Sequence, residues 1–138
     1  MDFAKARHNM VECQLRPNKV SDRTLLDRFR TVAREQFVDH AHQKLSYADE
    51  PTQIGEGRTM YSPMCCARLL QEMDLQPEDK VLVVAGGTGY TACIISPLVA
   101  EVHMVEENAY LTDIAKKAHM DSGCGNIHIT RGKPEEGH

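Results

Sequence analysis

The sequence predicts an α/β fold in which a parallel sheet occupies the second half of the chain and helices precede it. Three short runs typical of strands, at residues 81–84, 102–105 and 127–130, alternate with stretches of helical periodicity. A glycine cluster directly follows the first run, and alternating strands and helices place their strands in parallel. We therefore expect a helical segment at residues 1–76 and a β-α-β-α-β half-sheet at residues 77–138.

The helical segment opens with two expected helices. Apolar side chains at helical spacing predict the first at residues 4–15, and Pro17 ends it. Ser21 stands where an N-cap belongs, ahead of Leu25, Leu26 and Phe29 on one apolar face. This pattern predicts a second, amphipathic helix.

A loop and a third helix complete the segment. Residues 40–60 are polar and punctuated by a proline and two glycines, which predicts a loop. Ser62 can accept from the first free amides of a helix, and Pro63 at the first helical position loses no hydrogen bond. We expect this helix to run from Pro63 to about Met73.

The half-sheet follows in a regular order. Its expected elements are a turn at residues 76–79, a strand at 81–84, a helix at 90–95, a strand at 102–105, a helix at 111–120 closed by Gly123, and a strand at 127–130. A polar, turn-like tail at residues 131–138 comes directly after the third strand.

The position of the first strand has a consequence for assembly. In a doubly wound sheet the ligand crevice lies where the strand order reverses, between the first strand and the fourth. No fourth strand is visible in this sequence, so residues 81–84 would form an apolar, exposed edge. We expect a fragment or a shortened relative of a longer protein, able to oligomerise or to bind a partner through this edge.

Composition excludes several classes of function. A net charge of −4 disfavours nucleic acid as the main partner, and no apolar run approaches the length of a membrane span. The first residues lack the pattern of a secretion signal, so we expect a cytoplasmic protein. The five cysteines show no metal-type spacing, which suits reduced thiols, and His40 and His42 have no companion ligands. We expect no metal.

Gly87, Gly89 and Glu106 are the candidate cofactor residues. A strand, a tight glycine turn, a helix and a second strand ending in an acid are what a nucleotide-cofactor pocket needs. Glu106 ends the second strand and could accept hydrogen bonds from both ribose hydroxyls. The adjacent Glu107 is the alternative.

Several motifs in the right order resemble the protein-L-isoaspartate O-methyltransferase family. The matching segments are Arg34 to Val38, Tyr47 to Asp49, Ile54 to Thr59, Pro63 with Ala67, Val81-Leu82, Gly87 to Tyr90, Val105-Glu106 and Gly125 to Ile127. The resemblance implies a Rossmann-like fold and S-adenosylmethionine as cofactor. It also implies methyl transfer to isoaspartyl carboxylates in damaged proteins or peptides, as a step in protein repair.

This sequence departs from the family pattern around the implied site. Tyr61 stands where the family usually has a serine, and Ser62 comes one residue later, so Tyr61 and Ser62 are the candidate catalytic residues, beside Thr59 as a cofactor or substrate contact. Three further residues differ from what the resemblance implies near the cofactor: Val83 for an acid, Ala85 for a glycine, and Lys133 for an aspartate; Cys66 replaces a polar group that lines the site. Val83 and Ala85 are expected to weaken cofactor binding, and all the departures together are expected to lower activity.

Two alternatives therefore remain open beside the family's methyl transfer. The chain could be a binding or assembly module that has kept the fold while its site eroded. It could also be a methyltransferase with a different acceptor, because the loop at Thr59 to Ser62 has changed most.

Overall fold

The computed structural model describes residues 1–133 and 135. Of the expected tail, residues 134 and 136–138 lie outside this description. Contacts divide the chain into two units, Met1–Asp74 and Leu75–His138. This boundary lies close to the one expected at residues 76 and 77. Each unit is described by itself.

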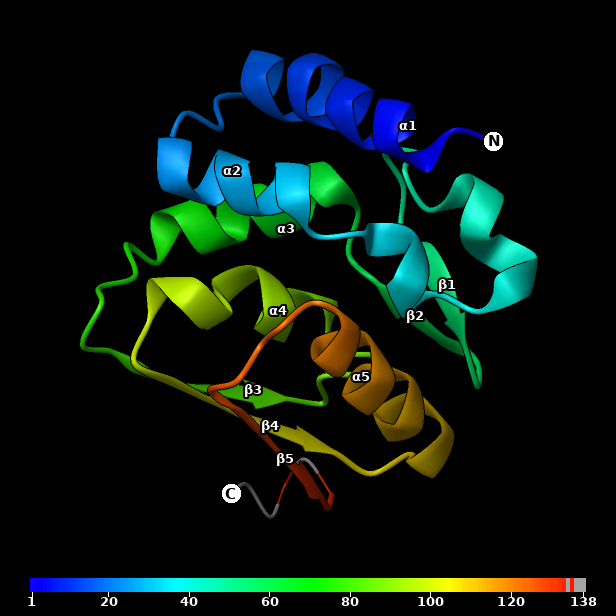
Figure 1. Ribbon diagram of the computed structural model, residues 1–138, viewed down its shortest axis with the longest axis vertical. Helices are drawn as coiled ribbons and strands as arrows, with labels where there is room; N and C mark the ends of the chain where they lie inside the picture. The colour runs from blue at the N-terminus through cyan, green and yellow to red at the C-terminus, as the bar shows by residue number, and fades with distance from the viewer. Residues whose placement is uncertain (134, 136–138) are drawn as a thin grey trace. The chain divides into compact units, whose positions relative to one another are not determined.

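The second unit contains the predicted parallel sheet, with strand order β3-β4-β5 (Figure 1). Its strands are β3 (Lys80–Val84), β4 (Glu101–Glu106) and β5 (Ile127–Arg131). The register pairs Val81 with Val102 and Val102 with Ile127. The prediction of three parallel strands is thus confirmed, and each strand is longer by one or two residues.

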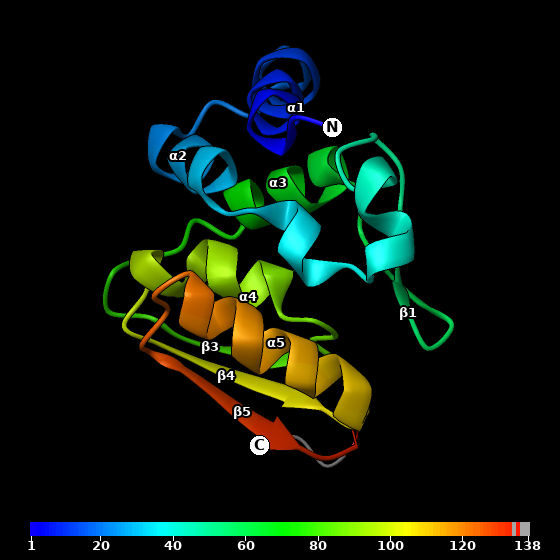
Figure 2. The same ribbon diagram turned by 45° about the vertical axis from the view of Figure 1, so that its right-hand side comes forward.

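Two helices cover one face of this sheet, as both views show (Figure 2). Helix α4 spans Tyr90–Ile95, as predicted, and α5 spans Ala109–Asp121, slightly longer than predicted. Asn108 caps α5 by accepting from the amide of Leu111, and Gly123 follows the helix with φ of 71°. The central strand β4 buries Val102, Met104 and Val105 completely against these helices and its neighbours.

Strand β3 is an edge of the sheet, as expected. Within the described residues it pairs only with β4, and its side chains alternate between partly covered and exposed. Leu82 and Val84 are 47% and 46% exposed, which is unusual for apolar side chains of a parallel sheet. An apolar edge of this kind is open to pairing with another chain.

The first unit packs helices together. Helix α1 (Phe3–Met10) continues as a π-helical turn, Val11–Leu15, and a 3-10 turn, Arg16–Asn18, which includes Pro17. Helix α2 spans Arg23–Thr31 and α3 spans Pro63–Glu72. Ser62 caps α3, as predicted, by accepting from the amide of Cys65.

One predicted cap was wrong. Asp22, not Ser21, caps α2, and its carboxylate accepts from the amide of Leu25 at 3.1 Å. The amide of Ser21 donates instead to the Oε1 atom of Gln71 at 2.8 Å. Both residue types are good caps, and this contact with α3 places Ser21 one residue outside the helix.

The expected loop at residues 40–60 was also wrong in part. It contains a 3-10 helix, His40–Leu45, and an antiparallel hairpin of β1 (Thr52–Gly55) and β2 (Arg58–Met60). The glycines do form a turn, since Gly55 and Gly57 have positive φ. The strands were missed because three or four residues carry too little alternation to be recognised.

No helix in the described part of the chain is both long and apolar enough to cross a lipid bilayer.

Candidate functional site

The carboxyl ends of β3 and β4 bring Gly87 and Glu106 into contact. The amide of Gly87 donates to Oε1 of Glu106 at 2.8 Å, and the amide of Asn108 donates to Oε2 at 2.9 Å. Glu106 has no exposed surface. Its carboxylate therefore links the turn after β3 to the first turn of α5.

The turn after β3 depends on an unusual backbone. Ala85 has φ of 54°, Gly87 has 62° and Gly89 has 83°. The left-handed region costs an alanine about 1 kcal/mol, whereas glycine adopts it freely. The methyl group of Ala85 is exposed, so the departure at this position acts through backbone strain and not through crowding by buried neighbours.

Gly86 is required by close packing. A Cβ atom at this position would lie 2.3 Å from Cγ of Met104, a side chain with no exposed surface. The amide of Gly86 also donates to the carbonyl of Val105 at 3.1 Å. The turn is thus held against β4 before it reaches α4.

His119, on α5, supports the same turn from the side of the helices. Its Nε2–H donates to the carbonyl of Gly89 at 2.9 Å, and the amide of Cys93 donates to that carbonyl at 3.0 Å. A Cβ atom at Gly89 would lie 2.5 Å from Nε2 of His119. Sequence reasoning did not single out His119, because a lone histidine on a helix carries no motif.

Burial lowers the pKa of His119 below its ordinary value of 6.5, and the hydrogen bond to Gly89 offsets this only in part. In the unfolded chain the imidazole binds a proton more readily, so protonation favours unfolding. Stability contributed by the neutral ring is present above pH 6.5 and is lost as the pH falls below it.

We expect the free energy of unfolding to decline on acidification below pH 6.5, with His119 adding a slope of up to about 1.4 kcal/mol per pH unit. In the His119→Gln variant this contribution to the pH dependence disappears, even if the variant is less stable at neutral pH. Urea denaturation between pH 7 and 5 measures the slope. The exposed His40→Gln is the control and keeps the decline of the original chain; parallel curves for all three proteins would contradict the prediction.

The other candidate residues lie in the first unit. Thr59 is exposed on β2, opposite Gln53, and Tyr61 is 63% exposed between β2 and α3. Ser62 uses its hydroxyl to cap α3. The structure therefore places Thr59, Tyr61 and Ser62 on one short segment, and places Gly87, Gly89 and Glu106 together in the second unit. The catalytic roles of Tyr61 and Ser62 stay predictions.

Arg34 anchors this segment and was missed as a site residue. Its guanidinium is completely buried and donates to the carbonyl of Tyr61 at 2.9 Å, to Oγ1 of Thr52 at 2.9 Å, and to the carbonyl of Ser46. Burying a charged side chain of this kind is costly, and these three hydrogen bonds offset part of that cost. Arg34 thereby fixes the backbone at Tyr61 from inside the first unit. Its place in a family motif was the available signal.

A second polar cluster adjoins Arg34. The hydroxyl of Tyr47 donates to Glu35 at 2.5 Å and accepts from Nε of Arg7 and from the amide of Arg34. Burial, together with the hydrogen bond to Glu35, raises the pKa of Tyr47 to about 12. Tyr47 therefore stays neutral and serves as a donor at physiological pH.

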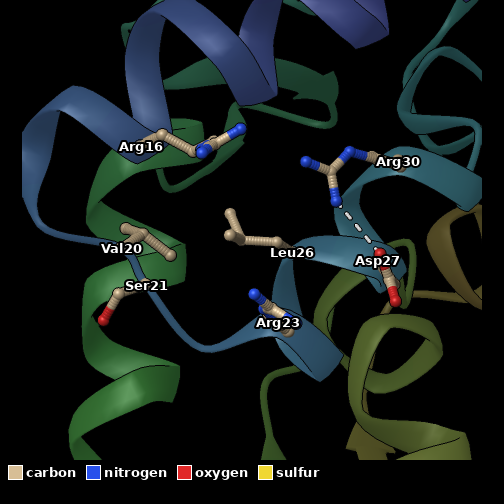
Figure 3. Close-up of a pocket in the computed structure, with 7 residues that line it drawn as sticks. All are labelled: Arg16, Val20, Ser21, Arg23, Leu26, Asp27 and Arg30. Carbon is tan, nitrogen blue, oxygen red and sulfur yellow. Dashed lines mark hydrogen bonds and ion pairs between the residues drawn. The ribbon is translucent and has the colours of Figure 1, made fainter.

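A hollow of about 500 Å³ lies elsewhere in the first unit (Figure 3). Arg16, Arg23 and Arg30 surround Leu26, and Arg30 pairs with Asp27 at 3.0 Å. The lining carries more positive than negative charge, and it holds none of the predicted site residues.

The remaining departures are placed as follows. Val83 lies within β3, Cys66 is buried in α3, and Lys133 is exposed after β5. The amide of Gly132 donates to the carbonyl of Glu106 at 3.2 Å, so the segment after β5 adjoins the end of β4. Among the described residues, no group of three potential ligands could hold a metal ion.

Comparison with known proteins identifies the family. The sequence pattern of the family described as protein-L-isoaspartate(D-aspartate) O-methyltransferase matches residues 6–138. The chain belongs to the protein-L-isoaspartate O-methyltransferase family. A relative of that name from Koribacter versatilis is 36% identical over 98% of this chain and 61% of its own length. One from Syntrophobacter fumaroxidans is 34% identical over 99% and 66%.

Solved structures agree with this assignment. A structure titled protein-L-isoaspartate O-methyltransferase superposes with a TM-score of 0.81 at 25% identity, over 96% of this chain and 44% of its own. A precorrin-6y C5,15-methyltransferase from Geobacter metallireducens, 12% identical, shares the fold with a TM-score of 0.51 over 56% and 42%. The Rossmann-like half-sheet is therefore confirmed. The chain spans about three fifths of the length of the curated isoaspartate methyltransferases named above.

Proposed function

We propose that this chain carries the cofactor turn and the substrate loop of a cytoplasmic enzyme that methylates isoaspartyl carboxylates in proteins, with S-adenosylmethionine as methyl donor. Family membership supports the reaction. The observation that carries the cofactor assignment is Glu106, held beside Gly87 at the carboxyl edge of parallel strands, where nucleotide ligands bind in such folds.

The carboxylate of Glu106 has the chemistry that is needed to bind the ribose of this cofactor. This carboxylate is an acceptor of the kind that a ribose hydroxyl needs, and it is held in place by the amides of Gly87 and Asn108, which both donate to it. Because Glu106 has no exposed surface, the atoms that cover it must move before a ribose hydroxyl can donate to it. Val83, in place of an acid, leaves the ammonium of the cofactor with one fewer partner.

The bound cofactor would supply a methyl group on a sulfonium, an excellent leaving group. The acceptor carboxylate is already ionised, so the protein needs no strong base and contributes mainly alignment and exclusion of water. In this proposal the loop at Thr59 to Ser62 aligns the acceptor. Arg34 positions that loop by holding the carbonyl of Tyr61. The oxygen of Ser62 is tied to α3 because it accepts from the amide of Cys65, whereas the side chain of Tyr61 is 63% exposed, so Tyr61 is the better candidate for contact with the acceptor.

Two measurements test the proposal. Isothermal titration with S-adenosylmethionine and its demethylated product should show binding of both, and labelled methyl groups should enter an isoaspartyl peptide but not its aspartyl twin. Absence of heat for both ligands would refute cofactor binding by this chain. Binding without transfer to the isoaspartyl peptide, but with label in other proteins of a cell extract, would support a different acceptor.

The edge strand supports a second candidate, a binding or assembly role. Leu82 and Val84 expose apolar surface on β3, and an extended segment of another chain could add to this edge. Recovery of one stoichiometric partner together with an absence of cofactor binding would favour this role.

Self-association of the chain tests whether the edge strand β3 pairs with another copy. We expect the chain to form oligomers at high concentration, and Leu82→Lys to lower the average mass toward that of the monomer, because a charge on an edge strand opposes pairing. Light scattering over a concentration series measures this. Met120→Lys, at a side chain that is 81% exposed on α5, is the matched control and keeps the association. A compact monomer at all concentrations would contradict the prediction.

A further inference from the structure

Cys93 and Cys124 lie in direct contact, 31 residues apart in the sequence. Their Sγ atoms are 2.9 Å apart, in the reduced state. Atoms that merely pack lie at about 3.5–4.0 Å. A disulfide bond measures about 2.05 Å, so closing it requires the two sulfurs to approach by only about 0.9 Å. Cys93 is fully buried on α4, and Cys124, just after α5, is partly exposed.

This contact closes a ring of interactions around the glycine turn. The carbonyl of Gly89 accepts from the amide of Cys93 and from His119, as described above. The amide of Cys124 in turn donates to the carbonyl of His119 at 3.0 Å. Together with the contact between the two thiols, these hydrogen bonds connect Cys93, Gly89, His119 and Cys124 in a closed loop.

We propose that Cys93 and Cys124 form a reversible disulfide when the protein meets a peroxide, and that this bond fastens α4 to the turn after α5. The proposal goes beyond the proposed function and does not rest on it. In cytosolic proteins such bonds are usually transient and sense the redox state.

The chemistry uses hydrogen peroxide as the oxidant. The thiolate of Cys124, which is the accessible one, attacks a peroxide oxygen; the O–O bond breaks, a sulfenic acid forms and one water leaves. The sulfur of Cys93 then attacks the sulfenic sulfur, the S–S bond forms, and the hydroxyl leaves with the thiol proton as a second water. Two thiols lose two electrons and two protons, and the peroxide takes up both.

Mass spectrometry of the tryptic peptides tests the proposal directly. The reduced protein is treated with hydrogen peroxide, its remaining thiols are alkylated, and it is digested without a reductant. Cys93 lies in the peptide of residues 81–116 and Cys124 in that of residues 118–131, so only a disulfide joins them. We expect this linked pair to exceed any other cysteine pair by on the order of tenfold, because the two sulfurs already touch. Dithiothreitol should separate the peptides.

Matched variants separate this pair from the other thiols. Cys124→Ser abolishes the linked peptide and Cys13→Ser leaves it unchanged; Cys93→Ser should behave as Cys124→Ser where it folds. A second measurement is hydrogen exchange, which should slow at the amides of α4 in the oxidised protein and return on reduction. Linkage of Cys65 to Cys66 or to Cys13 in its place, or oxidation of Cys124 to sulfinic acid without a crosslink, would overturn the proposal.

Discussion

Arg34→Met should destabilise the chain by about 3–5 kcal/mol, because three acceptors inside the first unit lose their donor at once. The loss follows from the acceptors left behind. The carbonyls of Ser46 and Tyr61 and the hydroxyl of Thr52 all accept from this guanidinium in the native state. An unsatisfied buried acceptor costs about 1–3 kcal/mol. Urea denaturation followed by circular dichroism measures the change.

Two companion variants make this result specific. Arg34→Lys keeps the charge but cannot reach three acceptors in fixed directions, so it should recover only part of the stability. Arg68→Met, on the exposed side of α3, should change stability by no more than about 0.5 kcal/mol. If Arg34→Met were as mild as Arg68→Met, the anchoring of Tyr61 by Arg34 would be wrong.

Glu106→Gln should impair both stability and cofactor binding. A carboxylate accepts from two amides at once, whereas the amide nitrogen of glutamine can only donate. Either the N–H of Gly87 or that of Asn108 then loses its acceptor, at a cost of about 1–3 kcal/mol. Loss of a negative charge next to the first turn of α5 adds to this. We expect affinity for S-adenosylmethionine to fall by about tenfold or more, since 1.4 kcal/mol corresponds to one factor of ten.

The neighbouring acid provides the control. Glu107→Gln changes an exposed carboxylate by the same one atom and should leave stability and affinity within twofold of the original, a range that corresponds to about 0.4 kcal/mol. Calorimetric titration and thermal unfolding measure the two properties separately. If Glu107→Gln lost the cofactor and Glu106→Gln kept it, the choice between the two acids would be reversed. If Glu106→Gln lost stability alone, the carboxylate would be purely structural.

The sheet and the glycine turn could be predicted because their signals are local. Residues 81–84 are apolar along their length, residues 102–105 carry one histidine among three apolar side chains, and Gly87 comes shortly after the first strand while Glu106 ends the next. Parallel strands bring these ends to the same edge of the sheet, which is why the spacing predicted one place for Gly87 and Glu106; the direct hydrogen bond between them was not predicted.

The supporting contacts could not be predicted because they join residues distant in the sequence. Arg34 reaches Tyr61 across 27 residues, and His119 reaches Gly89 across 30. No periodicity or spacing encodes such pairs. The hairpin at Thr52 to Met60 was not predicted for a different reason: its strands are too short to show the alternation of apolar and polar residues. The full burial of Glu106 could not be predicted either, because the sequence indicates a carboxylate at this position but not which atoms cover it.

The left-handed backbone of Ala85 has a consequence for how a ligand would be received. An alanine at φ of 54° is strained, so neighbouring contacts, including the hydrogen bond from the amide of Gly86 to the carbonyl of Val105, must hold the turn in this shape. A ligand that enters a cradle already folded into its receptive form loses little affinity to ordering of the chain. The conformational entropy of this turn is lost when the polypeptide folds, so the cost that remains for a ligand at this edge is the movement of the atoms that cover Glu106.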